Sequence, residues 1–240
     1  MRTEEKSNEI EAIPSLLNMI DVSGSIVTID AMGCQKKIAK KVIDQKADYV
    51  LALKQNQESL YNDVVSIFVQ GKEIQFKKML NRRIVEKVHD HGRAEIRRYT
   101  LISARDPLLF KLRWPGLNGI GMLEVTRTVN NEVERSVRYF LTSLAYENIN
   151  EFAQAVRKHW DIEINLHWSL DVSFREDLNR SRLGHSAENL SIVRRIGLNL
   201  LKQEKTHKNG ISCRRKRAGW DNSYLMKVLA AGSTVSNKKD

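Results

Sequence analysis

The sequence has few cysteines, no long apolar segment and fewer acidic than basic residues. Cys34 and Cys213 are the two cysteines in 240 residues. Two are too few for a disulfide framework or a cysteine-rich metal site, and this usage is typical of a reducing cytoplasm. No segment approaches the roughly 20 apolar residues that cross a bilayer, and the polar start MRTEEKSNEIE lacks the apolar core of a signal peptide. We therefore expect a cytoplasmic protein with no membrane partner.

Several familiar catalytic motifs are also absent. The sequence contains no Gly-x-x-x-x-Gly-Lys phosphate loop, no Gly-x-Ser-x-Gly nucleophile elbow and no Gly-x-Gly-x-x-Gly dinucleotide fingerprint. Nothing in the sequence therefore indicates a P-loop nucleotidase, an α/β-hydrolase of the usual kind or a dinucleotide-dependent enzyme.

The positive charge is large and unevenly distributed. Lys and Arg number 40 against 29 Asp and Glu, a net charge of +11. Residues 72–98 carry +5 and residues 191–217 carry +8, whereas residues 1–30 carry −4. Such an excess favours a polyanion partner, nucleic acid before membrane, although runs such as Arg214–Arg217 also occur as solvated surface. The phosphate contacts that we predict are Arg82, Arg83, Arg97, Arg98, Arg194, Arg195, Arg214, Arg215, Lys216 and Arg217.

Hydrophobic periodicity predicts an α/β protein. The β-branched run 25–29 and the apolar run 47–53 are typical of strands buried on both faces, and an amphipathic helix is predicted between them at 35–45. Together they form a βαβ unit. Alternating runs within 82–141 predict an antiparallel β insertion. Further helices are predicted at 8–20, 57–69, 150–170, 186–203 and 221–230, with a loose segment after Lys205.

These patterns divide the chain into four predicted segments. Residues 1–70 hold the βαβ unit, 71–145 the β-rich insertion, 146–205 a helical part of the core, and 206–240 a basic C-terminal tail.

Asp30 is the first candidate functional residue. It directly follows the first buried strand, and Lys54, Asn56 and Gln57 follow its predicted parallel neighbour. Ligand sites in open α/β sheets lie at the carboxyl ends of strands. Two interpretations stay open, because an Asp in this position also commonly caps the next helix.

Glu163 is the second candidate. At 100° per residue it lies among the apolar residues of the predicted helix 150–170, opposite polar residues such as Lys158 and Ser169. A buried carboxylate is costly unless it is paired or bound to a metal. Glu163 could form an ion pair with Arg157 or with His159 and His167, which lie one turn away on either side. A zinc site from Glu163 and these histidines is a third alternative, but the His-Glu-x-x-His motif is absent.

Five stretches together resemble the DDE transposases of the H-repeat-associated, ISAs-type family of bacterial insertion sequences. They span nearly the whole chain and are KSNEIEAIPSLL, IVTIDAMGCQKKIAKKVIDQKADYVLALKQNQ, YFLTSL, RKHWDIEINLHWSLDVSFRED and KRAGWDNSYLMKVL. The resemblance implies an RNase H-like core, with Asp30 as the second catalytic aspartate and Glu163 as the catalytic glutamate of a Trp-x-Ile-Glu signature at 160–163. Ile164 departs from the family pattern, which has Asn after the glutamate.

The resemblance also implies a reaction and its partners. Family members cleave DNA and transfer strands with two Mg²⁺ ions, here held in part by Asp30 and Glu163 with His159, His167 and Lys54 as supporting residues. The expected partner is double-stranded DNA at insertion-sequence ends, together with a second copy of the chain or an intact transposase.

One feature of the family pattern is missing. The first aspartate of the family lies in an Asp-Gly-Lys motif upstream of KSNEI, and the sequence contains no such motif. We therefore expect an N-terminally truncated enzyme with weak metal binding and little or no activity. The alternatives are a non-catalytic DNA-binding remnant that interferes with an intact transposase, and a relic without function.

Overall fold

The computed structural model describes residues 9–90, 93–105, 113–130 and 132–232, without the side chains of Glu9, Asp90, Arg93, Glu163 and Ile164. The chain forms two compact units, Met1–His159 and Trp160–Asp240. Among the described residues, no helix has the length and apolar character needed to cross a membrane.

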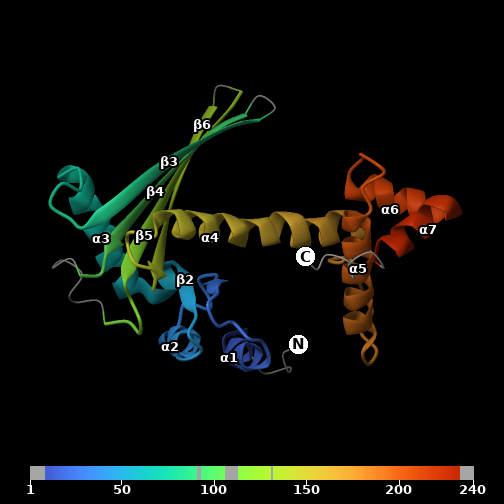
Figure 1. Ribbon diagram of the computed structural model, residues 1–240, viewed down its shortest axis with the longest axis horizontal. Helices are drawn as coiled ribbons and strands as arrows, with labels where there is room; N and C mark the ends of the chain where they lie inside the picture. The colour runs from blue at the N-terminus through green and yellow to red at the C-terminus, as the bar shows by residue number, and fades with distance from the viewer. Residues whose placement is uncertain (1–8, 91–92, 106–112, 131, 233–240) are drawn as a thin grey trace, which may run out of the picture. The chain divides into compact units, whose positions relative to one another are not determined.

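The first unit is built on one six-stranded mixed sheet (Figure 1). The strand order is β1-β2-β6-β5-β4-β3. β1 and β2 run parallel, and every other neighbouring pair is antiparallel. The strands are β1 (Ile26–Ile29), β2 (Asp48–Leu53), β3 (Asn81–Asp90), β4 (Arg93–Ser103), β5 (Gly119–Val129) and β6 (Glu132–Thr142).

Helices pack on both faces of this sheet. On one face, Val42 of α2 and Phe68 of α3 share a core with strand residues such as Met122. On the other, Phe152 and Val156 of α4 pack against Tyr99, Leu123 and Phe140. The helices of this unit are α1 (Glu9–Met19), α2 (Lys36–Asp44), the short η1 (Gln55–Gln57), α3 (Glu58–Glu73) and α4 (Ile149–Ile162).

The α/β class and the βαβ unit predicted from the sequence are confirmed. The antiparallel strands, however, continue the sheet of the βαβ unit, because β6 pairs directly with β2. Side chains fix this pairing: the Thr142 hydroxyl donates to the Tyr49 carbonyl at 2.7 Å, and the Ser143 hydroxyl oxygen accepts from the Tyr49 N–H at 2.8 Å. The four segment boundaries drawn from the sequence stay predictions.

A glycine allows α4 to lie close to the sheet. Gly121 of β5 faces the Phe152 ring, and a Cβ at this position would come within 2.2 Å of the ring's Cζ. The ring also makes edge-on contacts with Phe140 and Tyr99, at centroid distances of 5.6 and 6.4 Å. Phe152 therefore fixes α4, the helix that leads to Glu163, against the strands.

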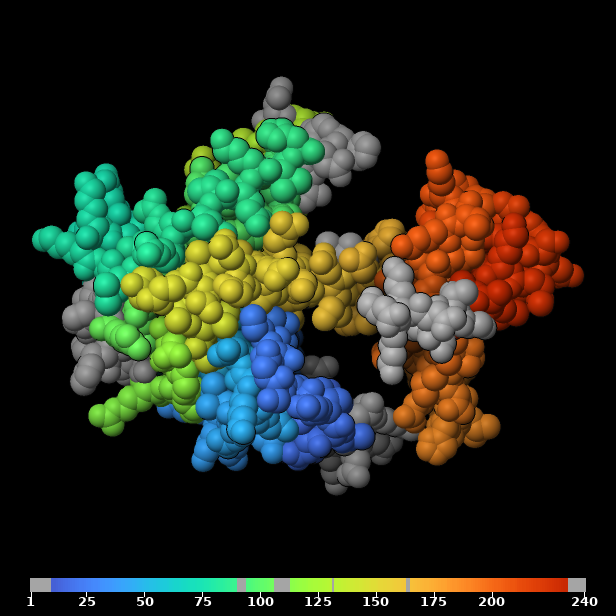
Figure 2. Space-filling model, in the orientation of Figure 1, coloured from blue at the N-terminus to red at the C-terminus, as the bar shows by residue number. Residues whose placement is uncertain are grey.

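The second unit, drawn in orange to red in Figure 2, is helical. Its elements are the π-helical η3 (Glu163–His167) and η4 (Ser169–Ser173), then α5 (Ser186–Gln203), α6 (Ile211–Trp220) and α7 (Asn222–Ala231). Leu201, Tyr224 and Val228 form its small core. The prediction of a loose segment from Lys205 to the last helix was wrong, because α6 occupies most of it.

Candidate active site

The carboxyl ends of β1 and β2 lie at one edge of the sheet, as the parallel pairing requires. Side-chain amides connect the loops that follow them. The Asn56 amide donates to the Ala31 carbonyl at 2.5 Å, and the Gln57 amide donates to the Cys34 carbonyl at 3.2 Å. These bonds hold the loop after Asp30 against the loop after Lys54.

Asp30 presents an exposed carboxylate at this edge. Its Oδ1 accepts the Gly33 N–H at 3.3 Å, which orders a tight turn after the strand. A Cβ on Gly33 would lie 2.2 Å from Cγ2 of Ile29, so the turn requires glycine at this position. The helix-capping interpretation of Asp30 was wrong: Gln35 is the N-cap residue of α2, and its side chain makes no capping bond.

His159 joins α4 to β1. Its Nδ1 lies 3.1 Å from the Thr28 hydroxyl, and the two residues are 131 positions apart. Because side chains alternate along a strand, Ile26 and Thr28 both face α4, and Asp30 directly follows the end of this strand. Thr28 was not singled out from the sequence, although this alternation was a signal that could have found it.

Glu163 opens η3 and belongs to the second unit, whereas Asp30 and His159 belong to the first. The meeting of the two carboxylates therefore stays a prediction. The single helical period assumed for 150–170 was wrong, because i→i+5 bonding replaces the α-helix after Ile162. Ser169, expected on the polar side, is buried. π-Helical turns are common at functional sites.

The other predicted site residues differ in their surroundings. Lys54 is exposed and directly follows β2, and His167 is exposed in η3. Arg157, an alternative partner for Glu163, lies 3.2 Å from Glu86. The described residues contain no group of three or more His, Cys, Asp or Glu side chains that could hold a metal, and the Glu163 side chain is outside that search. The zinc alternative is therefore untested.

The basic residues of the first unit divide between the two faces of the sheet. Arg97 lies on the face that α4 covers, where its Nε contacts a Glu95 carboxylate oxygen at 2.6 Å. Arg83 and Arg98 lie on the opposite face. Arg82 is exposed and alternates to the α4 face.

The arginines of α6 have partners within the second unit. The Arg214 guanidinium donates to the carbonyls of Asn209, Leu201 and Glu204. Arg215 lies over the ring of Phe174, and Arg217 pairs with Asp221 and lies over the ring of Tyr224. Arg194 is half-buried, whereas Arg195 and Lys216 are exposed.

Glu204 is a buried carboxylate that sequence analysis did not single out. Burial by itself raises its pKa, but hydrogen bonds from Thr206 and Tyr224 lower the pKa to about 2. The Tyr224 hydroxyl donates to Glu204 at 2.8 Å. Because its partners are internal, Glu204 is a structural anion that joins the end of α5 to α7.

Comparison with known proteins gives one consistent family. The model of the family described as "Transposase DDE domain" matches residues 1–200. The chain is 41% identical over 241 residues to "H repeat-associated putative transposase YhhI" of Escherichia coli (strain K12), covering 98% of this chain and 62% of that protein. It is 37% identical over 249 residues to "Putative transposase YncI" of Escherichia coli O157:H7, covering 100% of this chain and 62% of that protein. The chain thus spans about three fifths of the length of these relatives.

Proposed function

This chain belongs to the family of transposase DDE domains, and we propose on that basis that it serves in metal-dependent cleavage and strand transfer of DNA. Asp30 and Glu163 would supply two of the catalytic carboxylates. The exposed carboxylate of Asp30 at the carboxyl end of β1 is the observation that carries this proposal.

The sheet supports an RNase H-like interpretation of the core. The parallel β1-α2-β2 unit would be the second half of such a core, and the antiparallel strands β3–β6 would be an insertion before the glutamate-bearing helix. β1 pairs with β2 and lies at the edge of the sheet among the described strands. Its two-residue alternation directs Thr28 to the α4 side, and Asp30 directly follows the strand.

Asp30 fits the donor chemistry of a magnesium site. Mg²⁺ prefers hard oxygen ligands, and the Asp30 carboxylate is exposed, with one oxygen accepting the Gly33 N–H. A pair of such ions, when bound, activates the attacking oxygen and stabilises the leaving oxygen of a phosphodiester. The Gly33 bond would fix the orientation of the carboxylate before any ion arrives.

The position of His159 supports the role of Glu163. His159 contacts Thr28, two residues before Asp30. Glu163 follows His159 by four residues and opens the π-helical η3 directly after α4. We propose that Asp30 and Glu163 hold the same ions, with His159 and His167 as supporting residues. Lys54 would balance the charge of a phosphate at the same edge.

The proposed substrate is double-stranded DNA at the ends of an insertion sequence. The net charge of +11 favours a polyanion. A second copy of the chain or an intact transposase is the proposed protein partner, because strand transfer acts on paired DNA ends.

A DNA-cleavage assay with matched variants tests the proposal. The chain would be assayed with Mg²⁺ or Mn²⁺, alone and together with the part of the YhhI relative outside the matched stretch. We expect metal-dependent cleavage in at least one arm, lost in Asp30→Asn and in Glu163→Gln. It should be retained in Asp21→Asn, which removes another exposed carboxylate of the first unit.

Two results would count against this function. Cleavage that persists in both Asp30→Asn and Glu163→Gln would remove these residues from the site. DNA binding without cleavage in either arm would instead identify a non-catalytic DNA-binding protein.

A further inference from the structure

The two faces of the antiparallel part of the sheet, β3 to β6, differ in how many of their charged side chains form ion pairs. Residues that pair across antiparallel strands lie on the same face, as do residues two apart along a strand. By this rule, the face away from α4 carries four exposed basic residues from three strands. They are Arg83 and Lys87 of β3, Arg98 of β4 and Arg135 of β6, which we call the cationic face.

Several charged residues on the α4 side pair with one another, although Arg82 is exposed there. Glu95 contacts Arg97 at 2.6 Å and Arg127 at 3.4 Å, and Glu86 contacts Arg157 at 3.2 Å. These contacts neutralise Arg97, Arg127 and Arg157. Arg97, which was predicted from the sequence to contact phosphate together with Arg98, is thus already paired with an acid.

The cationic face has no such balance. Among the described strand residues of this face, Glu124 is the one acid, and Lys72 of α3 pairs with it at 2.6 Å. Lys87, Arg98 and Arg135 make no ion pair with any described residue, and Arg83 stacks on the Phe76 ring at 5.3 Å. The exposed Val85 and Val137 lie among them, and Glu124 lies opposite Arg98 in the strand register. Basic side chains nevertheless outnumber acidic ones on this face.

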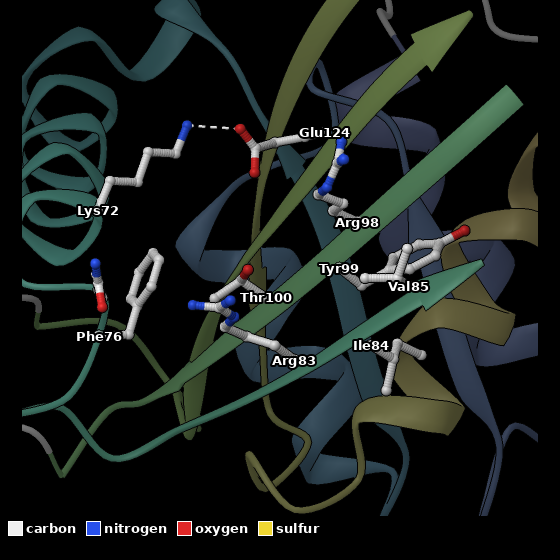
Figure 3. A pocket seen from close by; sticks show the side chains of 10 residues that line it. Lys72, Phe76, Arg83, Ile84, Val85, Arg98, Tyr99, Thr100 and Glu124 are labelled. Atoms are coloured by element: carbon white, nitrogen blue, oxygen red, sulfur yellow. Dashed lines mark hydrogen bonds and ion pairs between the residues drawn. The ribbon is translucent and has the colours of Figure 1, made fainter. Parts of the chain in front are cut away.

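The cationic face borders a hollow of about 560 Å³. Figure 3 shows Arg83, Arg98, Thr100 and the β5 residue Glu124 on the side of the sheet that faces Lys72 of α3. The Thr100 side chain is buried beneath the two arginines. An anion at this position would meet two guanidinium groups whose nearest carboxylate is already neutralised.

We propose that the cationic face is a docking surface for the phosphate backbone of duplex DNA. The proposal rests on the proposed function and assigns part of its DNA contact. Four strands span about 14 Å at ~4.8 Å per step, wider than the ~12 Å major groove. The sheet therefore lies across the backbone rather than inside the groove. Arg83 and Lys87 are about 14 Å apart along β3, which is roughly the rise of four base steps along the DNA helix axis.

Docking of this kind positions DNA without reading its sequence, because phosphates carry no base information. The cationic face would therefore hold flanking DNA, and its contribution to affinity would be the same for any duplex.

A salt titration of DNA binding tests the assignment. The full chain would be titrated with a short duplex of arbitrary sequence at several salt concentrations. The test variant changes Arg83, Lys87, Arg98 and Arg135 to Gln. The control variant removes the same charge elsewhere, by changing the exposed residues Lys37, Lys40, Lys78 and Lys227 to Gln. Circular dichroism melts check that both variants fold like the wild type.

The slope of log K against log salt is negative, and each lost phosphate contact reduces its magnitude by about 0.9. For the test variant, we expect the magnitude of this slope to decrease by about 3.6. Its Kd should rise by more than about 100-fold at low salt. The control variant should stay within about one slope unit of the wild type. A second readout uses the wild type alone: bound DNA should protect Lys87, but not Lys37, from acetylation.

The outcomes separate this inference from the proposed function. The docking surface would be overturned if the wild type and the test variant bind DNA with the same salt slope and Lys87 is not protected. That result would leave the roles of Asp30 and Glu163 untouched. A wild type that binds vesicles containing phosphatidylglycerol but not duplex DNA would overturn both.

Discussion

The contact between Gly121 and Phe152 predicts an energetic coupling that a double-mutant cycle measures. In Gly121→Ala the added Cβ would lie 2.2, 2.6 and 3.1 Å from three atoms of the Phe152 ring. Phe140 and Tyr99 hold that ring edge-on from two sides, and Phe152 is fully buried. These neighbours limit how far the ring can move, so overpacking should cost about 1–3 kcal/mol.

The second change relieves this clash. Phe152→Leu removes the ring and should by itself cost about 1–2 kcal/mol, less than the ~3–5 kcal/mol of Phe→Ala. In the double variant, the smaller and more flexible leucine leaves room for the new methyl group. We therefore expect the double variant to be more stable than the sum of the single effects predicts, by about 1–2 kcal/mol.

Urea unfolding followed by circular dichroism gives these free energies, and hydrogen exchange of the β5 amides assigns the loss to the first unit. Gly119→Ala is the matched control, because its Cβ would approach Ile102 and Leu101 rather than Phe152. Combined with Phe152→Leu, it should be additive. Additivity within about 0.5 kcal/mol for the Gly121 pair would refute the claim that Phe152 fixes α4 through this contact.

Three further predictions follow from individual contacts. Gly33→Ala should destabilise the first unit by about 1–3 kcal/mol, because Cγ2 of Ile29 blocks the new methyl group. An unchanged midpoint of urea unfolding would contradict this prediction. Because the pKa of Glu204 is lowered from 4.5 to about 2, its carboxylate stabilises the second unit above pH 4.5, and this contribution is lost as the pH falls toward 2. Glu204→Gln should flatten the pH profile of thermal unfolding over that range, and an identical profile would exclude the linkage. Arg214→Ala should lower the free energy of unfolding by about 1–3 kcal/mol because three carbonyls lose a donor. The control Lys216→Ala should change it by less than ~0.5 kcal/mol. Equal thermal shifts in the two variants would show that Arg214 is no more structural than its neighbour.

Local periodicity was sufficient to predict most elements of the first unit. The short β-branched run before Asp30 and the helix that follows it form the expected βαβ unit. The pairing of β2 with β6 joins distant residues, such as Tyr49 and Thr142, which are 93 positions apart, and no local pattern specifies it.

The second unit was harder to predict because arginines cover its apolar groups. On α6, Arg215 and Arg217 lie over aromatic rings that an apolar side chain would otherwise cover. Long basic side chains can bury apolar surface in this way, so α6 shows little apolar periodicity. The turns after Ile162 escaped prediction for a different reason, since a 3.6-residue period does not describe a π-helix.

The candidate site was only partly visible in the sequence. The position of Asp30 after a buried strand was sufficient to single it out, but its bond to Gly33 depends on the three-dimensional turn. The contact of His159 with Thr28 joins α4 to β1 and has no sequence signature.

The central claim is that Asp30 and Glu163 hold the same metal ions, and Mn²⁺ binding measured by electron paramagnetic resonance tests it most directly. Mn²⁺ would be titrated into the wild-type chain, Asp30→Asn, Glu163→Gln, the double variant and the Asp21→Asn control. The account predicts that each single variant weakens binding about tenfold or more, that the double variant is little weaker than either single one, and that the control binds like the wild type. Equal Mn²⁺ affinity in the wild type and both single variants would contradict it.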